Sequence, residues 1–485
     1  MSARRGVFGH AAVFGLAPLL QRVAGLVLLP LYTHNLAPGD YGEIELLTLA
    51  AGLVAMVLRM ELRPAFLRAW VEGDDPFRAG LLRRVGGVMA VVAVLGGAAA
   101  LLVSGPVCAW LVGHPVGLGV RVVLAVGIMA EVALMTPQAT LQAQLRSRMM
   151  VAVGVAQFVA GAGVSVVAVV GLGAGPLGVF LGGTVGLVVG WAGCTLVLQQ
   201  PRGALRQPRG AAVRIVPLLR FGLPLLAGGL LFFVVRNADR MIVAWALSVA
   251  ELGEYAVAWS MANLLLTLLF LPLQSSLDVW RHRLFLDAGG AVVFADVFRL
   301  AMVGMGLAAV GLDTVGVDLL LRVVDGRYVA AVALVPMLSA AVLLQVGYSI
   351  VASAFFVGGA TGRWTAIFAV GAVLQVGVSL VCVPRFGLWG APVGVLAANA
   401  WLYGAAAVWG VRWWAVPYRH GVMPVVLALV GGVVLLRVWW PGGALFASLV
   451  VDGLVGLVAL GVVFAAGLLR PRDFGAVFDL ARRRS

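Results

Sequence analysis

The residues with the greatest capacity for chemistry are charged side chains inside long apolar segments. Arg22 interrupts the first such segment, and Arg236, Asp239 and Arg240 interrupt a later one, VVRNADRMIVAW. Spacings of three and four residues place the last three on one face of a helix. An arginine costs roughly 3 kcal/mol at the centre of a membrane helix, so a chain that retains one there usually has a use for it. We predict that Arg22, Arg236 and Arg240 line a cationic, water-filled cavity.

Further charged residues are candidates for supporting roles. Glu131 lies well within an apolar segment, so Glu131 or Asp239 is a candidate charge partner or site for a coupling cation. Arg59 and Arg63, near the predicted cytoplasmic end of the second apolar segment, form a candidate access site for an anionic headgroup. Structural alternatives stay open: deep arginines also pair with neighbouring helices, and Arg59 and Arg63 also suit positive-inside anchors.

The sequence indicates no metal or cofactor site. Its five histidines are scattered singly, and its three cysteines, Cys108, Cys194 and Cys382, are far apart without the spacing of metal ligands. It contains no Walker A sequence, nucleophile elbow or HExxH motif. We therefore predict that the chain is not an enzyme and has no catalytic residues. A sodium ion or a proton is the one coupling partner that we consider.

Composition defines the environment in which these charges act. Apolar residues make up 62% of the chain and charged residues 11%, whereas soluble domains are about one-quarter charged. The 64 glycines suit helices that pack closely in lipid. All 34 basic residues are arginine, giving a formal charge of +14. In so apolar a chain this charge indicates the loops of a membrane protein and not a nucleic-acid partner.

A membrane-spanning helix needs about twenty apolar residues, and the chain offers about fourteen such segments. They lie near residues 8–34, 42–66, 85–104, 118–143, 149–171, 176–198, 219–246, 252–277, 291–312, 330–357, 364–383, 387–411, 421–438 and 444–469. We therefore predict an all-α polytopic membrane protein. With the N-terminus inside, the arginine clusters alternate with acidic loops along all these segments, which places both termini in the cytoplasm.

A weak internal echo divides the chain. DYGEIELLTLAAGL, after the first predicted helix, is similar to ELGEYAVAWSMANLL, after the seventh, so that Gly42 corresponds to Gly253. Six helices return the chain to the same side of the membrane, so the two repeats are parallel. The predicted parts are an N-terminal six-helix lobe (1–198), a cytoplasmic linker (199–218), a pseudo-symmetric six-helix lobe (219–411), and an additional helix pair with a basic tail (412–485).

The segments around these charges carry a family resemblance. The run from Arg22 through PLYTHNLAPGDYGEIELL resembles the start of bacterial polysaccharide-biosynthesis flippases of the Wzx type, in the multidrug/oligosaccharidyl-lipid/polysaccharide (MOP) exporter superfamily. RFGLPLLAGGLLFFVVRNADRMIV, followed by LGEYAVAW, resembles the start of the second lobe in that family. The two regions cover about a fifth of the chain. The last two predicted helices resemble the additional pair of lipid II flippases.

The resemblance implies a flippase of the bacterial cytoplasmic membrane, working by alternating access for surface polysaccharide biosynthesis. Its implied partners are an undecaprenyl-diphosphate-linked oligosaccharide and membrane lipids, with a polysaccharide polymerase or other export proteins as further candidates. Under this reading Arg22 and Arg240 line the cavity and Arg236 is a less certain partner. Guanidinium groups suit bidentate contact with pyrophosphate oxygens, which agrees with the implied substrate.

Three alternatives remain from the sequence. Lipid II flippases of the same superfamily usually carry an Arg-Asp pair in the first helix, and drug/cation antiporters usually carry an Asp-Thr or Asp-Met signature there; neither motif is present. A membrane polysaccharide polymerase or ligase usually has a long periplasmic loop, whereas the loops predicted here are short.

Overall fold

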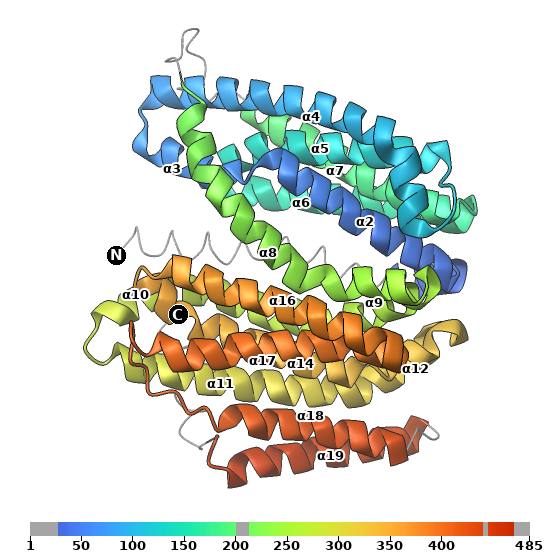
Figure 1. The fold of residues 1–485 in the computed structure, drawn as a ribbon, viewed down its shortest axis with the longest axis vertical. Helices are drawn as coiled ribbons and strands as arrows, with labels where there is room; N and C mark the ends of the chain where they lie inside the picture. The colour runs from blue at the N-terminus through green and yellow to red at the C-terminus, as the bar shows by residue number, and fades with distance from the viewer. Residues whose placement is uncertain (1–27, 200–212, 440–444, 470–485) are drawn as a thin grey trace. The chain divides into compact units, whose positions relative to one another are not determined.

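The structure, a computed structural model, describes residues 28–199, 213–439 and 445–469, and within these ranges it is helical with no strand (Figure 1). Residues 28–35 are helical and precede α2. The first elements in chain order are α2 (Pro38–Arg59), α3 (Leu62–Glu72), α4 (Asp75–Val112), α5 (Leu118–Ala143), α6 (Ser147–Val166), η1 (Val167–Gly171), α7 (Gly175–Gln199), α8 (Val216–Ala246) and α9 (Val249–Leu264).

The later elements complete the chain. They are η3 (Leu265–Phe270), α10 (Leu271–Leu286), α11 (Gly290–Gly311), η4 (Leu312–Gly316), α12 (Val317–Val323), η5 (Gly326–Tyr328), α13 (Val329–Val332), α14 (Val335–Val351), α15 (Ser353–Val357), α16 (Thr361–Phe386), η6 (Gly387–Trp389), α17 (Gly390–Gly410), α18 (Val422–Trp439) and α19 (Leu445–Ala465).

The predicted fold class is confirmed. Ten helical stretches of the described chain are long and apolar enough to cross a membrane, and one of them, residues 361–410, contains both α16 and α17, which gives eleven spans. With two shorter apolar helices, Val422–Leu436 and Val451–Ala465, the described residues contain thirteen of the fourteen apolar helices predicted. The first predicted helix, 8–34, would be the fourteenth and lies mostly outside the described residues.

The chain forms two compact units, Met1–Ala256 and Val257–Ser485. In the first unit, α5 packs against α4 and α7, α6 packs against α7, and α2 packs against α4, α5 and α8 (Figure 1). One apolar cluster joins α2, α3, α4 and α5 and includes the fully buried side chains Leu62, Phe66, Leu81 and Met89.

Small residues bring α6 and α7 close together, as expected for helices that associate in lipid. A Cβ atom added to Gly182 would lie 2.5 Å from the Gly161 carbonyl oxygen, and one added to Gly161 would lie 2.9 Å from the Gly182 carbonyl oxygen. Any larger side chain at either position would therefore push the two helices apart.

The break between α2 and α3 differs from the prediction of one continuous helix over 42–66. Met60 and Glu61 adopt left-handed conformations, with φ of 51° and 46°. Pro64 explains the break, because a proline has no N–H to donate to the carbonyl four residues earlier, here that of Met60, and its ring clashes with that carbonyl. The glycine at position 222 of α8 faces the released carbonyl: an added Cβ would lie 2.6 Å from the Met60 oxygen.

In the second unit, α14 packs against α11, α17 and α18, and α16 packs against α17 (Figure 1). The C-terminal helix pair attaches through α11: Val310 of that helix, Val433 of α18 and Ala459 of α19 form one buried cluster. A buried arginine strengthens the attachment, since Arg299 Nη1 donates a hydrogen bond to the carbonyl oxygen of Leu468 just beyond α19.

Candidate functional site

The predicted site residue Arg240 lies in α8 and forms an ion pair with Glu45 of α2. Both side chains are largely enclosed, with exposed fractions of 15% for Arg240 and 22% for Glu45. Because low polarity strengthens a charge pair and makes each unpaired charge costly, this contact is a strong link between α2 and α8. Glu45 therefore offsets the positive charge that the sequence assigns to Arg240.

The same face of α8 carries the other predicted charges. Asp239 is fully buried and accepts a hydrogen bond from the hydroxyl of Tyr255, at 2.7 Å between oxygens. Arg236 lies one helical turn before Arg240 and is half-buried. The structure thus brings together Glu45, Asp239, Arg240 and Tyr255, from α2, α8 and α9.

Directly beside these charges, the N-terminal ends of α2 and α9 are in backbone contact. A Cβ atom on Gly42 would lie 1.7 Å from the Val249 carbonyl oxygen, and one on Gly253 would lie 1.9 Å from the Pro38 carbonyl oxygen. Gly42 and Gly253 are the two glycines matched in the internal echo of the sequence. The echoed segments therefore face each other, and only glycine fits at either position.

A second set of charges lies at the other end of α2. Arg59 pairs with Glu131 of α5, with 3.0 Å between Nη1 and Oε1 and exposed fractions of 32% and 30%. Arg63 of α3 donates from Nε and Nη2 to the side-chain oxygen of Gln142, at 3.2 and 2.7 Å. Glu131 is thus the partner of a predicted headgroup-access arginine, and not of the α8 arginines.

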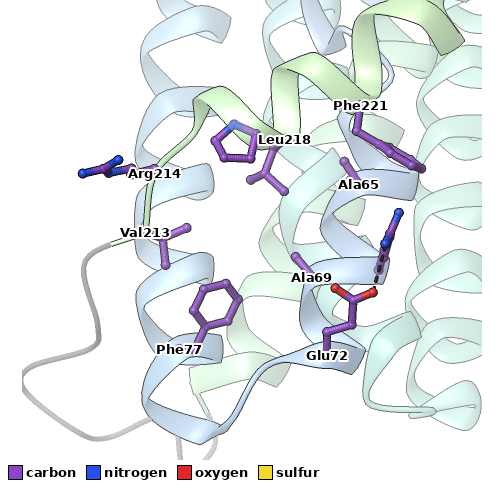
Figure 2. A pocket seen from close by; sticks show the side chains of 10 residues that line it. Ala65, Ala69, Glu72, Phe77, Val213, Arg214, Leu218 and Phe221 are labelled. Atoms are coloured by element: carbon purple, nitrogen blue, oxygen red, sulfur yellow. Dashed lines mark hydrogen bonds and ion pairs between the residues drawn. The ribbon is translucent and has the colours of Figure 1, made fainter.

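A pocket of about 460 Å³ opens between α3, α4 and the start of α8 (Figure 2). Its wall is apolar, with Phe77, Leu218 and Phe221 around it, and Arg68 and Arg214 contribute its positive charges. Arg68 pairs with Glu72 at 2.9 Å, and its guanidinium carbon lies 5.5 Å from the centre of the Phe221 ring. The predicted headgroup residues Arg59 and Arg63 do not line this pocket.

Arg22, the first residue predicted for the cavity, lies outside the described residues. Glu45 and Tyr255 were not among the predicted site residues, because nothing in the sequence indicates which side chains on α2 and α9 face α8. The structure begins α2 at Pro38, four residues before the predicted start, so Glu45 lies two turns inside the helix. Proline at the first position of a helix is common, and Pro38 was the signal for this earlier start.

No group of three or more His, Cys, Asp or Glu side chains within the described ranges is arranged to hold a metal ion. The site carries three charges close together: the largely enclosed ion pair of Arg240 and Glu45, and the fully buried carboxylate of Asp239. Such a site suits binding of a charged group and contains no evident nucleophile with its base.

Solved structures show the same fold. The chain is similar to the lipid II flippase MurJ in an inward closed conformation, with a TM-score of 0.69, 9% identity, and coverage of 94% of this chain and 99% of that one. It is also similar to an inward-facing multidrug resistance MATE family transporter of the MOP superfamily (TM-score 0.58, 16% identity, 84% and 93% coverage). A variant of the Vibrio cholerae MATE transporter VcmN gives a TM-score of 0.62 at 13% identity, covering 85% and 97%. The chain therefore has the fold that these flippase and transporter structures share.

Part of the sequence matches a known family. Residues 36–277, just under half of the chain, match the family described as polysaccharide biosynthesis protein. This range begins just before α2 and includes Glu45, Arg240, Gly42 and Gly253. No curated protein matches the chain significantly.

Proposed function

We propose that the chain translocates an undecaprenyl-diphosphate-linked oligosaccharide across the bacterial cytoplasmic membrane by alternating access. One observation carries this proposal: the ion pair between the largely enclosed guanidinium of Arg240 and Glu45 lies within the range that matches the polysaccharide biosynthesis family. A diphosphate offers several anionic oxygens in the geometry that a guanidinium binds bidentately, whereas Glu45 offers one carboxylate.

In this mechanism the substrate diphosphate competes with Glu45 for Arg240. When the diphosphate takes the guanidinium, α2 loses its charged link to α8, and the ends of α2 and α9 beside it separate. Release of the diphosphate on the other side restores the pair and closes those ends again. Arg22 and Arg236 add positive charge along the path, as the sequence predicts.

The predicted two-lobe plan indicates which side of the membrane opens when the diphosphate replaces Glu45 on Arg240. In that plan α2 belongs to the first lobe and α8 and α9 to the second, so the Gly42–Gly253 contact joins the lobes at the end predicted to be periplasmic. In the proposed cycle, the lipid-linked substrate enters from the cytoplasmic leaflet while this contact is closed. A sodium or proton gradient is the candidate energy source. Asp239 is the preferred site of coupling, because Glu131 forms an ion pair with Arg59.

Exchanging the charges tests the proposal. The double variant Arg240→Glu with Glu45→Arg keeps an ion pair between α2 and α8 but moves the guanidinium to the other helix. We expect membrane levels close to those of the unchanged chain and loss of surface-polysaccharide export in a flippase-null strain. The matched control exchanges the pair at the other end of α2, Arg59→Glu with Glu131→Arg, and we expect it to retain export.

Each result of this experiment has a clear reading. If the exchanged Arg240–Glu45 pair supports full export, the pair is structural and substrate binding by Arg240 is excluded. Accumulated undecaprenyl-linked intermediates identify the glycan: a cell-wall precursor would favour a lipid II flippase, and a surface repeat unit would support the proposal. Loss of resistance to cationic drugs, with export intact, would instead support a multidrug antiporter.

A further inference from the structure

A groove of about 310 Å³ runs between α2, α4 and α5 in the first unit. Its lining is almost entirely apolar, and small side chains of α4, including Gly96, Ala99 and Ala100, form one wall. Along α4 it extends from Gly96 to Leu111, which is about 22 Å at 1.5 Å per residue. That length covers more than half of a hydrocarbon layer about 30 Å thick.

One charged residue lines this groove, Arg121 in the first turn of α5. Its Nη1 lies against α4, where a Cβ atom added to Gly105 would approach it to 2.8 Å. The Nε atom is buried and makes no hydrogen bond with any described residue. An arginine that only anchors a helix at the membrane surface extends its guanidinium into water. Arg121 instead turns along the protein, over the groove.

The position of Arg121 is also unusual for the chain as a whole. It lies at the end of α5 that the arginine distribution predicts to be periplasmic, where arginines are few. An arginine at this end runs against the positive-inside pattern, which indicates a role other than topology. The groove below it leads along α5 to Ile128, near the middle of that helix, and along α2 to Leu58 in its last turn.

The shape of the groove and the charge of Arg121 indicate which kind of ligand the groove can bind. An apolar groove of about 310 Å³ with one guanidinium beside it suits one hydrocarbon chain that ends in a phosphate. Phospholipids carry two chains, so only half of one would enter. Burial of a long apolar chain and a charge-assisted contact to phosphate both favour binding.

We propose that this groove binds the polyprenyl chain of a polyprenyl phosphate or diphosphate, with its phosphate on Arg121. The site is separate from the Arg240–Glu45 pair, and it rests on the proposed function in taking the lipid carrier as ligand. It would hold the carrier on the predicted periplasmic side, after translocation, while its headgroup faces the surface.

Binding of undecaprenyl phosphate to the purified full chain, followed by native mass spectrometry, tests this proposal. Phosphatidylglycerol serves as the two-chain anionic competitor. We expect Arg121→Gln to weaken binding of undecaprenyl phosphate about tenfold or more, because a charge-assisted phosphate contact is lost. Val103→Trp fills the groove and should have a similar effect, with Ala99→Leu as a smaller filler in case the tryptophan variant does not fold.

The chain offers matched controls. Leu102→Trp adds the same bulk to α4 at a position that is 83% exposed and outside the groove. Arg84→Gln removes an exposed arginine from the other end of the same helix. Both should bind undecaprenyl phosphate as the unchanged chain does, and all variants should leave phosphatidylglycerol binding unaltered.

Three outcomes would overturn the proposal: groove variants that bind undecaprenyl phosphate normally, an equal loss of phosphatidylglycerol binding, or no binding by the unchanged chain. The first two leave the proposed function intact, because export and its dependence on the Arg240–Glu45 pair are measured separately in cells. Conversely, an exchanged pair with full export would remove the proposed role of Arg240 and leave the groove result standing.

Discussion

The two ends of α2 are built in opposite ways. At the Pro38 end, Gly42 touches backbone of α9 and the enclosed Glu45 holds Arg240, so the helix is in close contact with α8 and α9. At the Arg59 end, the helix breaks at Met60 and a pocket opens beside α3. The ion pair of Arg59 with Glu131 at this end is about one-third exposed. Glu45 and Arg59 are fourteen residues apart, or about 21 Å along the helix.

The difference between the two ends indicates which end of α2 moves during transport. A glycine contact with no space for a methyl group has two states, closed or separated, because packed interfaces do not deform gradually. The Arg59 end has room, exposed charge and a bend already in place, so it can adapt without separating. We therefore expect the Pro38 end to act as the gate and the Arg59 end to stay assembled during transport.

The largest effect should come from filling the glycine contact. Gly42→Ala places a methyl group where 1.7 Å separates it from the Val249 carbonyl oxygen, so the ends of α2 and α9 cannot close. Overpacking of this kind costs about 1–3 kcal/mol, or more where the backbone cannot yield. We expect loss of polysaccharide export, together with faster labelling of a cysteine introduced nearby, measured in intact cells.

The control for this prediction lies on the same helix. Gly52 has nothing within 4 Å of an added Cβ, so Gly52→Ala should retain export and labelling rates. Gly253→Ala, on the opposite face of the contact, should reproduce the effect of Gly42→Ala. Normal export by Gly42→Ala would mean that the two ends are not packed as closely in the working protein.

The two ion pairs of α2 should differ in strength. Glu45→Gln removes the carboxylate that pairs with the largely enclosed Arg240, and removal of one partner from a buried pair costs about 3–5 kcal/mol. Glu131→Gln leaves Arg59 about one-third exposed, so water compensates and we expect a loss nearer 1 kcal/mol. Thermal unfolding of the purified variants in detergent measures both. Equal losses would contradict the difference in burial between the two ends.

Sequence reasoning reached the fold and part of the site. Apolar segment length predicted the membrane helices, and the bounds of α5, 118–143, agree with the prediction to the residue. In the structure, two of the charges predicted on α8 have partners on other helices: Asp239 binds Tyr255 of α9, and Arg240 pairs with Glu45 of α2. Segment length and residue spacing are local patterns, since they follow from the helical repeat and the thickness of a bilayer.

What the sequence did not predict depends on contacts between distant segments. The partner of Arg240 is 195 residues away, and several acidic residues could have served equally. The helix break at Met60 was foreseeable from Pro64, but its fit against Gly222 required knowledge that α8 crosses there. The echo of Gly42 and Gly253 suggested two repeats, yet it contained no sign that the two glycines face each other.

A smaller effect is expected at the break in α2. Met60 has a left-handed backbone, which costs an ordinary L-residue roughly 1–2 kcal/mol, and glycine adopts it freely. Met60 also packs against the apolar cluster of α2–α5, so the effect of the backbone alone is measured by comparing Met60→Gly with Met60→Ala. We expect Met60→Gly to be the more stable of the two if the break persists throughout transport. Val57→Gly, one turn earlier in regular helix, should be about 1 kcal/mol less stable than Val57→Ala. A Met60→Gly variant that is less stable than Met60→Ala would indicate that α2 straightens there in the dominant state.

The smallest effect should be at the pocket beside α3. Arg68 and Glu72 form an i, i+4 pair at 2.9 Å, but both side chains are 63% exposed. Exposed pairs of this kind contribute about 0.3–0.5 kcal/mol, because water already solvates each charge and salt screens their attraction. Glu72→Gln should thus change the unfolding temperature barely measurably, and 1 M salt should erase the difference. A loss as large as that of Glu45→Gln would mean that the Arg59 end of α2 is as tightly fixed as the Pro38 end, and the contrast between the two ends would fail.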